Sequence, residues 1–406
     1  MMNRRGLGPL VRWGALLVLL LSGCLGGVAM PDPVTIVFIH PQDPTGLYAQ
    51  WAEQFQENHR HVTVELRTSG PPSAADVFVA TQFELAGYLQ SNTILDLSGF
   101  IEQTEAFNRA DYYPAALEIF RSQGRQWAVP FGIDMLMLFY NQDIFDRYGV
   151  AYPEVGWTWS GFLDRALATT DPGAGVFGYA LQHDGDLAIY EPVTLIYQRG
   201  GGIFDSLDAP TRVTFDAPAN VEALDFYASL IHVHGTAPTP QEAQQLGHPY
   251  PWLGVMGGRF AMWSMMFSER GGARWPTPWE MNWGVVPMPS DAVAGTLAMA
   301  EGLFVSAETE HPAEAWLWIT YLSQQISPLL VPARMSLAQS PAFERRTGST
   351  AAAAARAAVA DGILVNPEVL GFEPQLGVLV EAFVQIRSGE LTPEIALTGA
   401  QARSEH

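Results

Sequence analysis

Aromatic side chains dominate one stretch of this sequence. Five of its 12 tryptophans lie close together, at Trp252, Trp263, Trp275, Trp279 and Trp283. An indole offers a flat apolar face and a polar edge, which suits amphipathic ligands such as sugar rings and organic cations. The same residues also serve as ordinary core packing, so both interpretations stay open at this point.

Catalytic motifs are harder to find. The sequence has no Gly-x-Ser-x-Gly turn, no His-Glu-x-x-His pair and no Cys/His set with metal-ligand spacing. His232 and His234 are neighbours, but no third ligand follows them. All 21 basic residues are arginine, which excludes Schiff-base chemistry and a P-loop lysine. We therefore expect no enzyme, no cofactor and no metal. The paired carboxylates of a glycoside hydrolase remain a minor alternative.

The only cysteine, Cys24, follows a basic start and the apolar run 13–21. That run is too short to span a bilayer and fits a signal peptide. The small residues just before Cys24 resemble a bacterial lipobox, in which the thiol is acylated and becomes the mature N-terminus. An ordinary secretory signal or a short anchor helix is the alternative. We expect an exported protein that lipid at Cys24 holds on the membrane, at the cell surface or in the periplasm.

Composition limits the partners. The chain carries 42 acidic and 21 basic residues, a net charge of −21. Nucleic acids require basic surfaces, so they are excluded as partners, and the charge also disfavours lying flat on an anionic membrane. Removal of the signal leaves roughly 380 residues, enough for two sizeable hydrophobic cores.

The first third of the chain alternates strands with helices. Strands are expected at 34–40, 62–67 and 76–80. Leu47, Trp51 and Phe55 step by four, as on one face of a helix. This alternation predicts an α/β domain with a largely parallel sheet, in which ligands bind outside the carboxyl ends of strands. The loops at 41–45 and 81–84 are therefore the first candidate walls of a site.

The rest of the chain is richer in helices. Further strands are expected at 135–140 and 283–287. Helices are predicted at 143–148, from the segment 157–160 onward, and at 217–233, 312–322, 351–360, 378–387 and 393–402.

Short motifs follow one another in an informative order. They include Ala75–Phe78, Trp127–Pro130, Leu138–Asn141, Trp157–Trp159, Gly258–Trp263, Trp283–Pro289 and Glu301–Ser306. In order and spacing they resemble the extracellular solute-binding proteins, family 1, of ABC importers, the class of maltose-binding and other sugar-binding proteins. The resemblance covers nearly all of the mature chain, and it rests on the order of the motifs because each alone is weak.

The resemblance implies an α/β fold of two lobes, with the type II-like architecture of periplasmic binding proteins, a hinge and a ligand cleft between the lobes. The implied parts are a lipoprotein signal peptide (1–23), a tether (24–33), an N-terminal lobe (34–133 plus 291–331) and a C-terminal lobe (134–290 plus 332–406). Closure about the hinge would let a ligand contact both lobes and shift the population toward the closed state.

The resemblance also implies a set of ligand contacts. The expected ligand-binding residues are Gln42, Asp43, Gln82, Phe83, Asp134, Tyr190, Glu191, Trp263, Phe267, Glu301 and Arg334. Trp263 takes the position of a stacking tryptophan, and Asp134 that of a hinge carboxylate that accepts ligand hydroxyls. Departures at 83–84 and around 375–380 argue against maltodextrins. Structural roles remain alternatives for Asp43, as a helix cap, and for Asp134, Glu301 and Arg334.

We therefore expect the substrate-binding component of an ABC importer, a monomer that captures a mono- or oligosaccharide and delivers it to permease subunits in the membrane. One alternative keeps the fold but binds an organic cation, such as a polyamine or betaine, as the net charge of −21 would favour. A secreted glycoside hydrolase is the second alternative.

Overall fold

The structure, a computed structural model, describes residues 32–43, 45–105, 107–181, 187–207, 209–245, 251–275, 277–291, 293–364, 366 and 373–405. The predicted signal peptide, Cys24 and most of the predicted tether lie outside these residues. Within the described ranges, none of the helices has both the length and the apolar character that crossing a bilayer requires.

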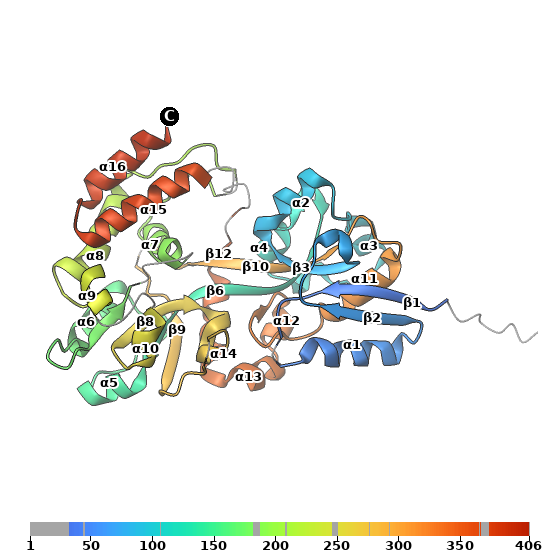
Figure 1. The fold of residues 1–406 in the computed structure, drawn as a ribbon, viewed down its shortest axis with the longest axis horizontal. Helices are drawn as coiled ribbons and strands as arrows, with labels where there is room; N and C mark the ends of the chain where they lie inside the picture. The colour runs from blue at the N-terminus through green and yellow to red at the C-terminus, as the bar shows by residue number, and fades with distance from the viewer. Residues whose placement is uncertain are drawn as a thin grey trace, which may run out of the picture.

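A mixed β-sheet runs through the whole molecule (Figure 1). Its strand order is β2-β1-β3-β10-β6-β8-β7, with β9 and β11 also paired to β6 and β12 paired to β10. The strands are β1 (Val34–Ile39), β2 (Val62–Arg67), β3 (Val77–Thr81), β6 (Val129–Asn141), β7 (Phe177–Ala180), β8 (Phe260–Met266), β9 (Trp283–Pro287), β10 (Thr296–Val305), β11 (Val331–Pro332) and β12 (Gly362–Leu364). A separate hairpin joins β4 (Arg121–Ser122) to β5 (Arg125–Gln126).

The directions of the strands correct one expectation. β1 runs parallel to β2 and β3, as predicted. The rest of the sheet is mixed. β10 is antiparallel to both β3 and β6, and β6 is antiparallel to β8 and β9, whereas β7 is parallel to β8 and β12 is parallel to β10. The central strands run between the two halves of the molecule in opposite directions, which a simple strand–helix alternation does not anticipate.

Strand β6 is common to both halves. Its first half pairs with β10 and β11, and its second half pairs with β8 and β9. All of its residues are buried. Gly132 lies against Leu330, since a Cβ at this glycine would approach that side chain to 2.6 Å. The backbone is thus closely packed where β6 meets the segment that leads into β11. The exact lobe boundaries given above remain a prediction.

One set of helices covers the half that contains β1 to β3 (Figure 1). These are α1 (Leu47–Asn58), α2 (Leu85–Ser91), α3 (Ser98–Gln103), α4 (Pro114–Glu118) and α11 (Pro312–Leu322), with the short 3-10 segments η1 (Pro72–Ala74), η2 (Gln82–Glu84) and η3 (Arg109–Asp111). Helix α1 forms as predicted: it buries Tyr48, Trp51 and Phe55 at intervals of three and four.

A second set of helices covers the other half. It comprises α5 (Gln142–Tyr148), α6 (Trp159–Thr169), α7 (Leu187–Gln198), α8 (Pro218–His232), α9 (Pro240–Gln245), α10 (Pro251–Met256), α15 (Glu373–Ser388) and α16 (Pro393–Ser404). The 3-10 segment η4 (Phe267–Gly272) follows β8 directly. Beneath the middle of the sheet lie α12 (Met335–Ala338), α13 (Pro341–Thr347) and α14 (Ser349–Ala360) (Figure 1). The helices predicted from sequence are found within a few residues of their expected ends.

Three hydrophobic clusters hold these layers together. The largest contains Phe38 and Trp318 in the first half and extends through Ala352 of α14 to Trp263 and Trp279 in the second half. Another fills the second half around α7, α8 and α15. A smaller one lies around Phe78 and Phe304, on β3 and β10. The second cluster lies mainly in the second half and the third in the first half, while the largest cluster extends across both halves.

Candidate functional site

Glu301 lies at the centre of the candidate site. It sits on β10, opposite Thr81 of β3 and Gly132 of β6. Its side chain is 17% exposed and pairs with Arg274, whose Nη2 lies 3.9 Å from Oε1. Burial raises the pKa of Glu301 to about 7; Arg274 opposes this rise and Asp134 adds to it. The carboxyl group therefore exchanges its proton close to neutral pH.

Asp134 joins the central strand β6 to the segment after β8. It is 4% exposed and stands opposite Met299, two residues from Glu301 on β10. Its Oδ1 accepts hydrogen bonds from the backbone N–H groups of Met135, at 3.1 Å, and Ser268, at 2.9 Å. Burial raises the pKa of Asp134, although the hydrogen bonds from Ser268 and nearby arginines favour the charged form. These bonds are internal to the protein, as the structural alternative for Asp134 requires, and its choice between ligand and hinge roles stays a prediction.

Segment η4 and the residues after it carry functional candidates that the sequence analysis missed. Glu269 accepts a hydrogen bond from Nε1 of Trp275 at 2.9 Å, and burial raises its pKa. Arg274 was missed as well. The sequence does contain a feature that could have indicated these residues: the apolar strand β8 ends at Met266, and the polar run 268–274 follows its carboxyl end. We call Glu269 and Arg274, together with Asp134 and Glu301 described above, the charged group.

Arg270, in contrast, has a structural role. Its guanidinium donates to the carbonyl oxygens of Leu329 and Pro328, both at 2.6 Å, and of Phe267 at 2.9 Å. It also lies 4.1 Å from the centroid of the Phe267 ring. Burial lowers the pKa of Arg270 to about 10. Arg270 thus fastens η4 to the segment that precedes β11, and leaves Arg274 as the arginine that faces Glu301.

The loop after β1 approaches the same place. Tyr48 has a raised pKa because of burial and because Glu301 and Asp43 lie close to it. Asp43 accepts hydrogen bonds from the backbone N–H groups of Thr45, at 3.0 Å, and Tyr48, at 2.9 Å. These bonds outweigh burial and hold the pKa of Asp43 below its usual value. Asp43 therefore caps the first turn of α1, its alternative role, while Gln42 beside it is exposed.

The loop after β3 is packed inward. Gln82 is fully buried, and its Oε1 accepts a hydrogen bond from the backbone N–H of Ala300 at 2.6 Å. Phe83 packs against the hydrophobic cluster of the second half. Glu84 closes a capping box with Thr81, whose N–H donates to Oε2 at 2.9 Å. Gln82 thus helps to position β10, and its role as a ligand contact stays a prediction.

Two predicted stacking residues are also covered by protein. Trp263 is fully buried, stacked on Phe139 at 6.1 Å between centroids and edge-on to Trp279 at 5.2 Å. Phe267 is fully buried too, beneath Arg270. Neither ring is exposed in this structure, which favours a core role, and the expected stacking role stays a prediction. Of the tryptophans noted above, Trp263, Trp275, Trp279 and Trp283 form one packed aromatic cluster. The side chain of Trp252 is not among those that the structure describes.

The remaining predicted residues have mixed outcomes. Glu191 is 2% exposed and accepts a hydrogen bond from Ser264 Oγ at 2.8 Å inside the second half, and its expected ligand role stays a prediction. Arg334 donates from Nε to Asp111 at 2.7 Å, and whether it also contacts ligand stays a prediction. Tyr190 reaches the central strands, with its OH 3.6 Å from the sulfur of Met299. The described residues contain no group of three or more His, Cys, Asp or Glu able to hold a metal ion.

Comparison with known proteins supplies the family. A family model described as the bacterial extracellular solute-binding protein matches residues 42–325. The chain belongs to this family. As a solute-binding protein it has the two-lobed α/β fold that the motifs predicted, and the expected family is confirmed.

Individual relatives of this solute-binding protein are distant in sequence. An uncharacterized lipoprotein in the oleD 5' region of Streptomyces antibioticus is 25% identical over 386 residues, which cover 87% of this chain and 84% of the relative. The arabinooligosaccharide-binding protein of Halalkalibacterium halodurans is 24% identical over 199 residues, 48% of this chain and 41% of the relative. The ABC substrate-binding protein Lmo0181 of Listeria monocytogenes, solved in complex with cycloalternan, superimposes with a TM-score of 0.75 at 20% identity, covering 92% of this chain and 98% of that one.

Proposed function

We propose that this protein is the substrate-binding component of an ABC importer, which captures a mono- or oligosaccharide between its lobes and delivers it to a membrane permease without catalysis of its own. The observation that carries the proposal is the family match over residues 42–325. A relative named for arabinooligosaccharide binding and a similar structure bound to cycloalternan support a carbohydrate as the ligand.

The charged group suits a polyhydroxylated ligand. Carboxylates of Glu301 and Glu269 accept hydrogen bonds from hydroxyls, and the guanidinium of Arg274 donates to ring and hydroxyl oxygens. Gln42, Asp43 and Tyr190 are the predicted contacts that complete the proposed site. A buried polar group left without a partner costs about 1–3 kcal/mol, so a sugar whose hydroxyls match these groups is selected over one that does not.

Closure of the lobes is part of the proposal. Glu301 belongs to β10, and Arg274 follows η4, which Arg270 and Asp134 hold against the central strands. A ligand anchored at these groups that also contacts residues of both lobes would gain more contacts when the lobes approach. Such a ligand shifts the population toward the closed form.

Membrane attachment belongs to the same proposal. Acylation at Cys24 would keep the binding lobes close to the permease, and the family and the Streptomyces lipoprotein relative support an exported, anchored protein. We propose that the protein acts as a monomer, with permease subunits and a cytoplasmic ATPase as its partners.

An organic cation is the second candidate ligand, and the charged group itself favours it. The three carboxylates of Asp134, Glu269 and Glu301 face one arginine, Arg274, since Arg270 is bonded to backbone carbonyls. Burial raises the pKa values of these carboxyls, and a bound cation would favour their charged forms, so that their excess over arginine would then attract a polyamine or betaine. Affinity for a cation would fall steeply with added salt, whereas affinity for a neutral sugar would not.

Ligand titration followed by tryptophan fluorescence tests the proposal, because Trp275 bonds directly to Glu269 and belongs to the aromatic cluster. We expect a saturable change with at least one member of a panel that includes arabinooligosaccharides and cycloalternan. Arg274→Ala should weaken that binding more than tenfold. Arg125→Ala is the matched control, because Arg125 is also exposed and pairs with a single carboxylate, Asp96, at 3.6 Å. No response to any sugar, with salt-sensitive binding of spermidine, would establish the cation instead.

A further inference from the structure

Strand β10, which carries Glu301, loses its regular partner on one side just before that residue. Strand β3 stops at Thr81, opposite Glu301, and the chain then turns into η2. If β3 continued in this register, the backbone of Gln82 would stand opposite Ala300. Gln82 belongs to η2 instead, so the ladder does not reach the N–H of Ala300, a fully buried residue.

The side chain of Gln82 supplies the acceptor that the backbone of β3 does not. Its Oε1 accepts a hydrogen bond from the N–H of Ala300 at 2.6 Å, and Gln82 is fully buried. The segment that carries this amide is itself fixed, because Thr81 and Glu84 close a capping box around η2. A buried N–H without a partner is costly, so this bond holds β10 against η2 one residue before Glu301.

On its other side, β10 meets a β-bulge at the same place. The pairing with β6 shifts between Glu301 and Gly302, which leaves Phe131 without an opposite residue on β10. Pro130, the partner of Gly302, has no N–H to donate to the ladder. A bulge interrupts the ladder and re-aims the side chains beside it. The orientation of Glu301 therefore depends strongly on what holds β10 on the β3 side.

Close packing leaves this part of β10 little freedom to compensate for a lost bond. A Cβ at Gly302 would approach the ring of Phe120 to 2.8 Å. A Cβ at Gly132, which stands opposite Glu301, would approach Leu330 to 2.6 Å. A local displacement of the backbone at Ala300 would thus reach the adjacent Glu301 instead of being absorbed by loose neighbours.

The ionisation of Glu301 reports on its position, because charged groups of several elements face it. Burial raises its pKa, Asp134 of β6 and Glu84 of η2 add to the rise, and Arg274 after η4 opposes it. Tyr48 of α1 is close enough to Glu301 for its own pKa to rise. A shift of β10 would change these distances and the access of water to the carboxyl group.

We propose that Gln82 is a positioning residue of the binding site, which sets the orientation of Glu301 toward the ligand through the backbone of β10. The inference rests on the proposed function of the charged group, in which Glu301 bonds to the ligand. The effect of Gln82 is transmitted by its bond to Ala300 and does not require that its amide touch the ligand.

A double-mutant cycle tests this transmission. Gln82→Met keeps a side chain of similar length without a carbonyl oxygen, and it should weaken binding of the panel sugar that responds in the titration more than tenfold. In a Glu301→Gln background the same change should weaken binding less than threefold, because the two residues act as one. Spermidine replaces the sugar if only the cation binds.

The ligand-free protein gives a second measurement, which a direct contact between Gln82 and ligand would not change. Loss of the bond to Ala300 should admit water to Glu301, so that its raised pKa falls toward the ordinary value. The free energy of unfolding should then fall less between about pH 5 and about pH 8 in Gln82→Met than in the wild type. Gln82→Asn, whose amide is one methylene shorter, should change this slope in the same direction and serves if Gln82→Met does not fold.

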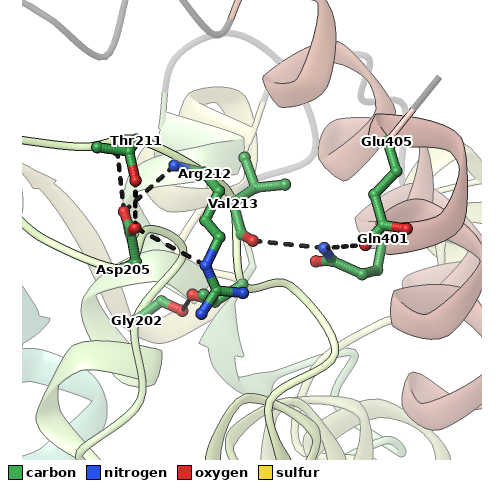
Figure 2. A network of polar contacts seen from close by, with 8 residues as sticks. Gly202, Asp205, Thr211, Arg212, Val213, Gln401 and Glu405 are labelled. Atoms are coloured by element: carbon green, nitrogen blue, oxygen red, sulfur yellow. Dashed lines mark hydrogen bonds and ion pairs between the residues drawn. The ribbon is translucent and has the colours of Figure 1, made fainter.

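Gln401 of α16 provides the matched control. Its Oε1 accepts a hydrogen bond from the backbone N–H of Phe215 at 2.8 Å, as that of Gln82 does from Ala300. Its Nε2 donates to the carbonyl of Val213 at 3.4 Å (Figure 2). Helix α16 lies at the outer edge of the second half, away from β10 (Figure 1). Gln401→Met should therefore lower stability while it leaves the pH slope unchanged and the ligand affinity within threefold of the wild type.

The outcomes separate this inference from the proposed function. An unchanged pH slope in Gln82→Met and Gln82→Asn would overturn the inference and leave sugar binding in place. Losses of affinity that add in the double variant would do the same, as would equal effects of Gln82→Met and Gln401→Met. Binding of neither sugar nor cation would count against the proposed function, and the pH slope of the ligand-free protein would still decide whether Gln82 positions Glu301.

Discussion

The side chain of Asp134 accepts a hydrogen bond from the backbone N–H of Ser268 at 2.9 Å, across 134 positions of sequence. One partner lies on the central strand β6 and the other begins the polar part of η4. Together with the bonds of Arg270 to the carbonyls of Leu329 and Pro328, this bond holds η4 in place, so the position of Glu269 relative to Asp134 depends on it.

Removal of that acceptor should therefore cost both stability and affinity. Asp134→Ala leaves a buried N–H without a partner, and we expect a loss of about 1–3 kcal/mol in the free energy of unfolding. Asp134→Asn keeps an acceptor oxygen and should lose less. Urea denaturation measures both variants. Equal stability of Asp134→Ala and the wild type would show that Ser268 finds another partner.

Glu301 should make stability depend on pH in a defined direction. Its pKa is about 7 in the folded protein against an ordinary value of 4.5, so the folded state holds more protons between these values. The free energy of unfolding contributed by Glu301 is then greatest at low pH and falls as pH rises through this window. Glu301→Gln should flatten that fall, which denaturation at about pH 5 and about pH 8 would measure. Glu102→Gln, on the exposed face of α3, is the control and should not alter the slope.

Trp263 should behave as a core residue. Trp263→Ala opens a cavity beside Phe139 and Trp279, and we expect a loss of about 3–5 kcal/mol in the free energy of unfolding. Trp263→Phe retains an aromatic ring and should lose less. Sugar affinity, measured by calorimetry well below the unfolding temperature, should change less than threefold in Trp263→Phe. A much larger loss of affinity in a stably folded variant would restore the stacking role.

Cys24 should decide where the protein is found. Cys24→Ser removes the thiol that lipid would modify, and we expect the variant to leave the membrane fraction on cell fractionation while it still binds sugar. Retention of the variant in washed membranes would point to the uncleaved apolar segment as the anchor.

Much of the fold was predictable because its elements have clear periodicity. β1, α11 and β9 appear at or within a residue of their expected ends, since runs of apolar residues and capping signals mark them. Strand β10 was not predicted. Its Ala, Met and Gly residues have little β propensity, and its partners β3 and β6 are remote in sequence, so only tertiary pairing identifies it.

The site was predictable only in part for a similar reason. Glu301 and Asp134 could be named from motif positions, but the direction of each side chain could not. In β8, Ser264 points to Glu191 and the adjacent Trp263 points to Trp279, because successive residues of a strand face opposite sides. A prediction that is correct for the strand can thus place the wrong side chain in the site.

The hydrophobic cluster that continues from Phe38 through α14 to Trp279 has a consequence for folding. Two lobes with separate cores would melt as separate units, each at its own temperature. Here the loss of packing in one half removes neighbours from the other, so heat should unfold both together in one cooperative transition. The architecture that separates the lobes for binding would then leave them thermodynamically a single unit.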